Sequence, residues 1–162
     1  KCIGNAQPDF SLNFNTSVAW KNFDVSLYFN SVVGNDIYNN LANVIDNLSM
    51  FSKGSNTTVH ATQTNEAFNN VLDYSNRYIE DGSYLRLSSA TLGYTVPLKN
   101  KRYISNLRFT LTGNNLFVIT GYSGYDPEVN SNRTSNGVPA LGIGWTNYPM
   151  ARSYSLGVSI DF

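Results

Sequence analysis

The chain has 162 residues, which suits one domain or a piece of a larger one. Its 11 basic and 11 acidic residues balance, so the composition gives no sign of the basic surface that nucleic-acid binding needs. Aromatic residues make up 14% of the chain, as do charged residues. This composition argues against a disordered protein, because disordered chains have few aromatic and many charged residues. The single cysteine, Cys2, excludes an internal disulfide.

The first two predicted strands form a hairpin. Apolar and small polar residues alternate over 9–20, where the sequence is DFSLNFNTSVAW, and again over 22–33, where it is NFDVSLYFNSVV. A period of two residues is typical of a strand with one apolar face. The turn at Lys21 and Asn22 is short enough to pair the two strands directly.

A long loop is predicted over 34–83. Helical spacing within it predicts a short helix that includes Ile37, Leu41, Val44, Ile45 and Leu48. A connection of this length is unusual in a compact domain and is typically functional.

Three further strands are predicted over 84–96, 105–119 and 151–162. The apolar phase changes within the first of them, and a bulge near Ser88 and Ser89 would bring all of its apolar residues to one face. A short polar connection precedes the second strand, and a long loop over 121–150 precedes the third.

Together the strands predict an all-β fold, the antiparallel wall of a transmembrane β-barrel. Short and long connections alternate, so they fall at opposite ends of one sheet, as in outer-membrane barrels. The predicted strands exceed the mean of about five to six residues in soluble proteins and match the roughly nine to eleven that a tilted membrane strand needs. The apolar face would contact the lipid bilayer, the long loops would be extracellular, and the C-terminus would be periplasmic.

Five strands cannot close a barrel, because the smallest outer-membrane barrels have about eight. We therefore expect the chain to be a segment of a larger barrel. The alternative is a soluble or surface-displayed carbohydrate-binding β-sandwich, since sandwich strands also alternate. That alternative requires Phe14, Leu27 and Leu156 to pack in a dry interior between two sheets.

Four stretches of the chain resemble, in the family's order, the C-terminal barrel segment of SusC/RagA-type TonB-dependent outer-membrane transporters. They are IGNAQPDFSLNFNTSVAWKNFDVSLYFNSVVGNDIYN, IEDGSYLRLSSATLGYTVP, LRFTLTGNNLFVITGYSGYDPEVN and YPMARSYSLGVSIDF. The resemblance implies the last five strands of a plugged barrel of about 22 strands, with the plug domain absent from this chain. It implies active import of glycans or peptides across the outer membrane of a Gram-negative bacterium, with no enzymatic activity and no cofactor.

The resemblance also implies the partners of the complete protein. These are the remainder of the same barrel and its plug, a SusD-like surface lipoprotein, TonB acting through the missing N-terminal part, and the barrel-assembly machinery. The pair of receptor and lipoprotein is expected to form a dimer of heterodimers. By the same resemblance, the last strand carries the signal that the assembly machinery recognises: Tyr154, Leu156, Val158, Ile160 and Phe162.

The second long loop contains the candidates for contacts with the lipoprotein lid or the substrate: Tyr122, Tyr125, Asp126, Trp145 and Tyr148. For the stretch 122–128 we expect first a structural role, with Gly124 and Pro127 fixing turns. Trp145 and Tyr148 could equally belong to the outer aromatic girdle of the barrel. Asp126 and Glu128 are too few for a calcium site, and His60 lacks a second ligand at metal-binding spacing. We therefore predict no metal site.

Overall fold

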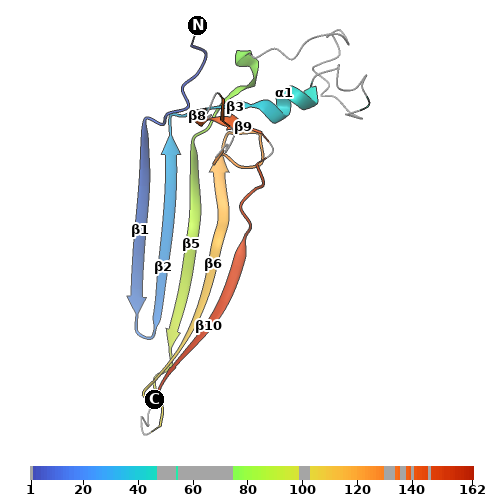
Figure 1. Cartoon of the computed structure of the whole chain (residues 1–162). Coiled ribbons are helices and arrows are strands. Elements are labelled where there is room, and N and C mark those ends of the chain that lie inside the picture. Colours follow the sequence, from blue (N-terminus) through green and yellow to red (C-terminus); the bar gives the residue numbers. More distant parts are fainter. Residues whose placement is uncertain are drawn as a thin grey trace. The chain divides into compact units, whose positions relative to one another are not determined.

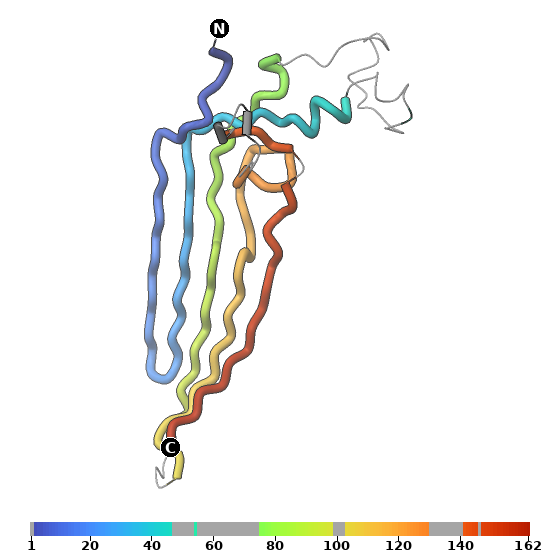
Figure 2. The backbone as a smooth tube through the Cα atoms, viewed as in Figure 1, coloured from blue at the N-terminus to red at the C-terminus, as the bar shows by residue number. Residues whose placement is uncertain are grey.

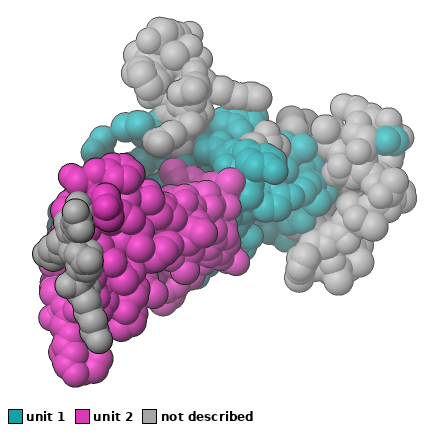
Figure 3. All heavy atoms as spheres, turned by 90° about the horizontal axis from the view of Figure 1, so that it is seen from below, with its two compact units in different colours: residues 1–10, 33–83, 120–149 teal, residues 11–32, 84–119, 150–162 magenta. Residues whose placement is uncertain are grey.

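The computed structural model describes residues 2–46, 54, 75–98, 103–129, 134–135, 138–139, 141–145 and 147–162. The chain divides into two compact units, which are coloured separately in Figure 3. Unit 1 comprises residues 1–10, 33–83 and 120–149, and unit 2 comprises residues 11–32, 84–119 and 150–162. Unit 2 is built from long strands, whereas unit 1 is built from the connections between them.

Unit 2 is a five-stranded sheet in the order β1-β2-β5-β6-β10, and neighbouring strands run in opposite directions (Figure 1). The prediction of an antiparallel sheet is confirmed. The predicted strand ranges lie within two residues of those in the structure, which are β1 (Phe10–Trp20), β2 (Phe23–Val33), β5 (Tyr84–Thr95), β6 (Asn106–Thr120) and β10 (Ser153–Asp161).

The turn between β1 and β2 is tight, as the backbone trace in Figure 2 shows. Lys21 takes a φ of 54° there, in the left-handed region that a two-residue hairpin turn requires. The connections between β2 and β5 and between β6 and β10 are long and contribute most of unit 1.

A bulge in β5 keeps its apolar residues on one face. Tyr28 pairs with Ser89 and Phe29 pairs with Leu87, so Ser88 is the extra residue on the bulged strand. The predicted bulge at Ser88 and Ser89 is therefore confirmed. Without the bulge, the apolar residues before and after Ser88 would lie on opposite faces of the sheet.

Unit 1 contains a three-stranded sheet of β4 (Ile79–Asp81), β3 (Asp36–Asn39) and β9 (Ile143–Gly144), in that order. Strand β3 pairs antiparallel with β4 and parallel with β9. The remaining elements are α1 (Asn40–Asp46), the 3-10 helix η2 (Asn76–Tyr78), and the paired β7 (Thr134–Ser135) and β8 (Val138–Pro139). The two predicted loops thus contain short strands that sequence periodicity did not indicate.

The predicted short helix is partly wrong. Helix α1 contains Leu41, Val44 and Ile45, but Ile37 belongs to β3, and Leu48 lies outside the described residues. Ile37 is fully buried, because it lies on the central strand of the small sheet. No helix in the described part of the chain is long and apolar enough to span a membrane.

Candidate functional site

One face of the unit 2 sheet is apolar and exposed. In the β6–β10 pair, Leu156 lies opposite Leu111 and Val158 opposite Phe109, and the pair between them is Gly157 and Thr110. Phe14 is 55% exposed and Leu156 is 76% exposed. The dry interior that the sandwich alternative requires is therefore not seen at these positions of the described chain.

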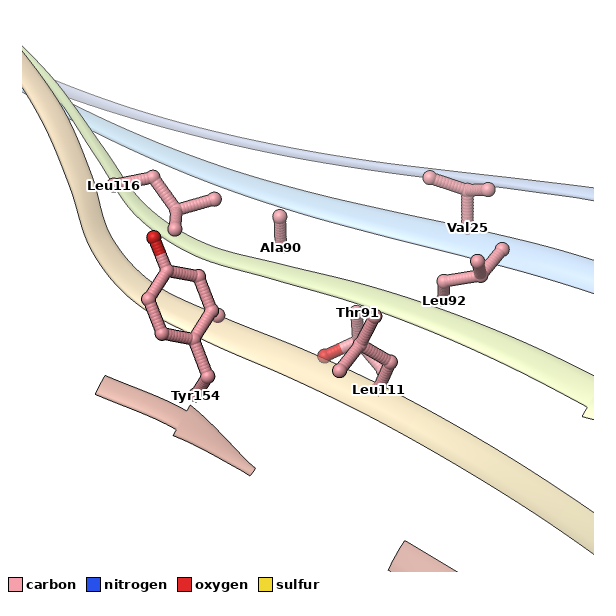
Figure 4. Close-up of a pocket in the computed structure, with 8 residues that line it drawn as sticks. Val25, Ala90, Thr91, Leu92, Leu111, Leu116 and Tyr154 are labelled. Carbon is pink, nitrogen blue, oxygen red and sulfur yellow. The ribbon is translucent and has the colours of Figure 1, made fainter. Parts of the chain in front are cut away.

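A shallow groove of about 210 Å³ follows this face (Figure 4). Its small residues, Ala90 and Gly113, lie among larger side chains, which leaves the hollow between the strands. The other residues that line it are Val25, Thr91, Leu92, Leu111, Leu116 and Tyr154.

The opposite face of the sheet carries an ion pair that crosses a strand. Arg108 on β6 donates two hydrogen bonds of 2.7 Å to the carboxylate of Asp24 on β2, although β5 lies between these two strands. The residue beneath the pair is Gly93, and a Cβ at this position would meet both the Arg108 guanidinium and the Asp24 carboxylate. The absence of a side chain at Gly93 is what allows the pair to span three strands.

Further polar contacts tie strands together on this face. Thr91 on β5 and Thr112 on β6 share a hydrogen bond of 3.0 Å. Tyr28 on β2 donates its hydroxyl proton to Asn13 on β1. Cross-strand pairs of this kind stabilise sheets and fix their register. The Asp24–Arg108 pair was not predicted from the sequence. Its available signal was that Asp24 and Arg108 are opposite charges on the polar faces of strands that carry no other charge.

The residues of the predicted assembly signal lie along β10 and just beyond it. Tyr154, Leu156, Val158 and Ile160 all lie on the apolar face, and all are exposed. Phe162 follows the last strand residue, Asp161, and is 92% exposed. Their recognition by the assembly machinery stays a prediction.

Glu80 joins the two long connections within unit 1. Its carboxylate accepts hydrogen bonds from the backbone N–H of Ser123 at 2.6 Å, from the hydroxyl of Ser123 at 2.7 Å and from the side-chain amide of Asn39 at 2.8 Å. Asn39 also caps α1, since its Oδ1 accepts the N–H of Ala42. One side chain of β4 therefore fixes the start of α1 to the segment that follows β6.

A second cluster surrounds Tyr122, which is 7% exposed. Its ring lies against Gly124 and Gly144, where a Cβ would collide with it. Burial raises the pKa of Tyr122 to about 12, and the negative charge of Glu80 adds to this shift. The hydroxyl therefore stays protonated at any physiological pH.

The structure brings four of the five predicted loop candidates together around a very small cavity of about 10 Å³. Tyr122, Tyr125, Asp126 and Trp145 all line it, together with Asn147, whereas Tyr148 does not. This volume is close to the minimum that holds one water molecule. The cavity is therefore too small for a ligand larger than water.

The exposure of the candidates separates two buried and two exposed side chains, and Trp145 is half-buried. Tyr122 and Asp126 are buried, at 7% and 6%, and Asp126 uses Oδ1 to accept the N–H of Glu128 in a turn. Tyr125 is 68% exposed and Tyr148 is 91% exposed, so these two side chains are the ones free to meet another molecule. Contact with a lid or substrate stays a prediction for both.

The described residues contain no group of three His, Cys, Asp or Glu side chains that could hold a metal ion. His60 lies outside the described residues, so its predicted lack of a metal role is not addressed by the structure.

Comparisons with known proteins give consistent matches, although no protein-family model matches the chain. It is 32% identical to TonB-dependent receptor P3 of Formosa agariphila, in an alignment that covers 100% of this chain and 17% of that receptor. It is 30% identical to TonB-dependent receptor SusC of Bacteroides thetaiotaomicron, over 95% of this chain and 15% of that receptor. The chain thus spans less than a fifth of the length of these curated relatives.

Solved structures show the same fold. A structure of the RagAB peptide transporter matches with a TM-score of 0.70 and 21% identity, over 97% of this chain and 17% of that chain. The RagAB peptide importer in its closed-closed state matches with a TM-score of 0.70 and 22% identity, over 97% of this chain and 18% of that chain.

Proposed function

We propose that this chain forms part of the wall and outer loops of an outer-membrane importer. The chain is homologous over its whole length to a C-terminal portion of the SusC/RagA-type TonB-dependent receptors. These relatives are transport proteins rather than enzymes, and the proposed role involves no bond chemistry. The homology supports an outer-membrane location for the complete protein.

The observation that carries this proposal is the exposed apolar face of the five-stranded sheet. A soluble protein rarely leaves such a continuous apolar surface in water, whereas the outer surface of a membrane barrel must be apolar. The groove lined by Ala90 and Gly113 belongs to this face, and lipid acyl chains would fill it.

The edges of the sheet support a larger barrel. Among the described strands, β1 and β10 each have one neighbour, and a strand in hydrocarbon must satisfy all its backbone groups by pairing. We infer that the remainder of a barrel of about 22 strands pairs with both edges. The polar face, with the Asp24–Arg108 pair, would then line the lumen around the plug.

The partners and cargo follow from the same homology. The matching structures are described as a peptide transporter and a peptide importer named RagAB, which supports a peptide cargo and a second, SusD-like subunit above the outer loops. Glycan import is the alternative. TonB would act through the plug, the barrel-assembly machinery would insert the barrel, and the receptor and lipoprotein would form a dimer of heterodimers.

Cysteine labelling on intact cells tests the orientation. The exposed native Cys2 is first replaced by Ser in the complete receptor, and Gly54→Cys or Tyr103→Cys is then introduced. We expect a membrane-impermeant maleimide to label Cys at position 54, in the first long connection, on intact cells. Position 103, in the short connection, should be labelled only after the outer membrane is permeabilised. The reverse pattern, or labelling of both positions on intact cells, would refute the proposed topology.

A further inference from the structure

Unit 1 carries a hollow of about 250 Å³ beside α1, next to the Tyr122 cluster, with which it shares Leu41, Gly124 and Tyr125. One wall is the aliphatic side of α1, and the other is the segment that follows Tyr122. The residues that line it are Asn39, Leu41, Ala42, Ile45, Ser123, Gly124 and Tyr125.

The N–H and O–H groups of Asn39 and Ser123, the two polar side chains on the inner wall of this hollow, already donate hydrogen bonds within unit 1. Asn39 directs its amide group to Glu80 at 2.8 Å and to Ser123 at 3.1 Å, which accounts for both of its N–H bonds. Ser123 donates its single hydroxyl proton to Glu80 at 2.7 Å. Among the described side chains that line the hollow, Tyr125 alone has a donor for which the described residues show no partner.

This pattern decides which chemistry fits the hollow. A sugar ring carries several hydroxyl groups, and it would leave them poorly paired against saturated polar groups and an aliphatic wall. None of the described side chains that line the hollow carries a formal charge, so these residues do not select an ionic group. An apolar group needs no hydrogen-bond partner there, and it would gain contact with Leu41, Ile45 and the exposed ring of Tyr125.

We propose that this hollow binds one apolar side chain, of about the size of leucine or phenylalanine, from a peptide that is being imported. An apolar cavity of about 150 Å³ accommodates benzene, so a hollow of about 250 Å³ has room for one such side chain. Tyr125 forms the exposed outer wall, and Glu80 fixes the inner wall by joining Asn39 to Ser123. This inference rests on the proposed role of the complete protein in import.

The test uses the complete receptor with three probes: a fluorescein-labelled peptide Gly-Ser-Leu-Ser-Gly, the same peptide with Ser in place of Leu, and maltopentaose. Burial of one leucine side chain should make the leucine peptide bind about tenfold to a hundredfold more tightly than the serine peptide. Ala42→Trp, which fills the hollow, should abolish this preference. Tyr125→Ala, which removes its outer wall, should reduce it. Leu141→Ala is the matched control, because Leu141 is exposed in the same unit but does not line the hollow, and it should leave the preference unchanged.

Each other outcome overturns the inference. Equal binding of the two peptides by the native receptor, a preference that survives Ala42→Trp, or Tyr125-dependent binding of maltopentaose would show that the hollow does not select an apolar peptide side chain. Loss of the lipoprotein partner in Ala42→Trp, without any leucine preference in the native receptor, would assign the hollow to the lid instead. If the labelling at positions 54 and 103 follows the expected pattern while these tests fail, only the peptide site is refuted.

Discussion

Leu27→Arg is the substitution whose effect can best be worked from the structure. Leu27 is four residues beyond Phe23, the first residue of the 11-residue strand β2, and it pairs with Ala90 on the apolar face. At about 3.3 Å per residue the strand is about 33 Å long, and at a tilt of about 40° it spans about 25 Å, the height of the apolar band of a membrane barrel.

Leu27 then lies about 13 Å along the strand from its short-turn end and about 10 Å into the membrane. This position is close to the midplane of the apolar band, where an arginine on the lipid face costs about 2–4 kcal/mol. We expect Leu27→Arg to lower the free energy of unfolding of the complete barrel by that amount.

The assay is denaturant unfolding of the complete receptor reconstituted in lipid vesicles, with the midpoint and slope measured together. Ser26→Arg is the matched control, because Ser26 is the neighbouring residue and pairs with Thr91 on the polar face. It should change the free energy of unfolding by less than about 1 kcal/mol, as is usual for solvated positions. Equal losses for the two variants, or a larger loss for Ser26→Arg, would show that the faces have been assigned wrongly.

Three further predictions concern the ion pair, the loop cluster and the C-terminus. Gly93→Ala should displace the flexible ends of Asp24 and Arg108 without straining the backbone, so Gly93→Ala and Asp24→Asn should each lower the free energy of unfolding of the barrel. The double variant should lose no more unfolding free energy than either single variant. Additive losses in a double-mutant cycle would contradict a shared mechanism. The raised pKa of Tyr122 means that its folded form resists ionisation, so stability is lost as the pH rises from 10 toward about 12. The difference in unfolding free energy between the native protein and Tyr122→Phe should accordingly be constant below pH 10 and shift in favour of the Phe variant above it, and a difference independent of pH would be inconsistent with this burial effect. Deletion of Phe162 from the complete receptor should lower its level in the outer membrane, measured by immunoblotting of membrane fractions, and an unchanged level would argue against an assembly role.

The strands of unit 2 were predictable because their signal is local. Alternation with a period of two residues marks each strand and its apolar face without knowledge of the neighbouring strands. The break in phase at Ser88 was also readable, since only a bulge returns Leu85 and Leu92 to the same face.

Unit 1 was not predictable in the same way. Strand β3 is four residues long and pairs with β9, which is more than a hundred positions further along the chain. Pairing with this distant strand, rather than the sequence pattern of β3, therefore determines that β3 is a strand. Ile37 shows the consequence. Its spacing to Leu41 fits a helix, but pairing with β4 and β9 holds it in a strand.

The polar interactions of the candidate sites depend on tertiary placement. Glu80 contacts Ser123 and Asn39 only because three distant segments converge, and no spacing rule relates them. The Asp24–Arg108 pair likewise depends on the order of the strands and on a glycine in the strand between them. Strand periodicity predicted which face these residues share, but it did not predict that they meet.

The accessibility of β10 to oxygen and to a water-soluble nickel complex tests the central claim most directly. Nitroxide spin labels would be placed one at a time at residues 153–161 of the complete receptor in lipid vesicles. Our account predicts that collisions with oxygen are highest at positions 154, 156, 158 and 160, and collisions with the nickel complex are highest at the positions between them. An absence of this two-residue alternation, or high nickel accessibility at Leu156 and Val158, would contradict contact between the apolar face and lipid.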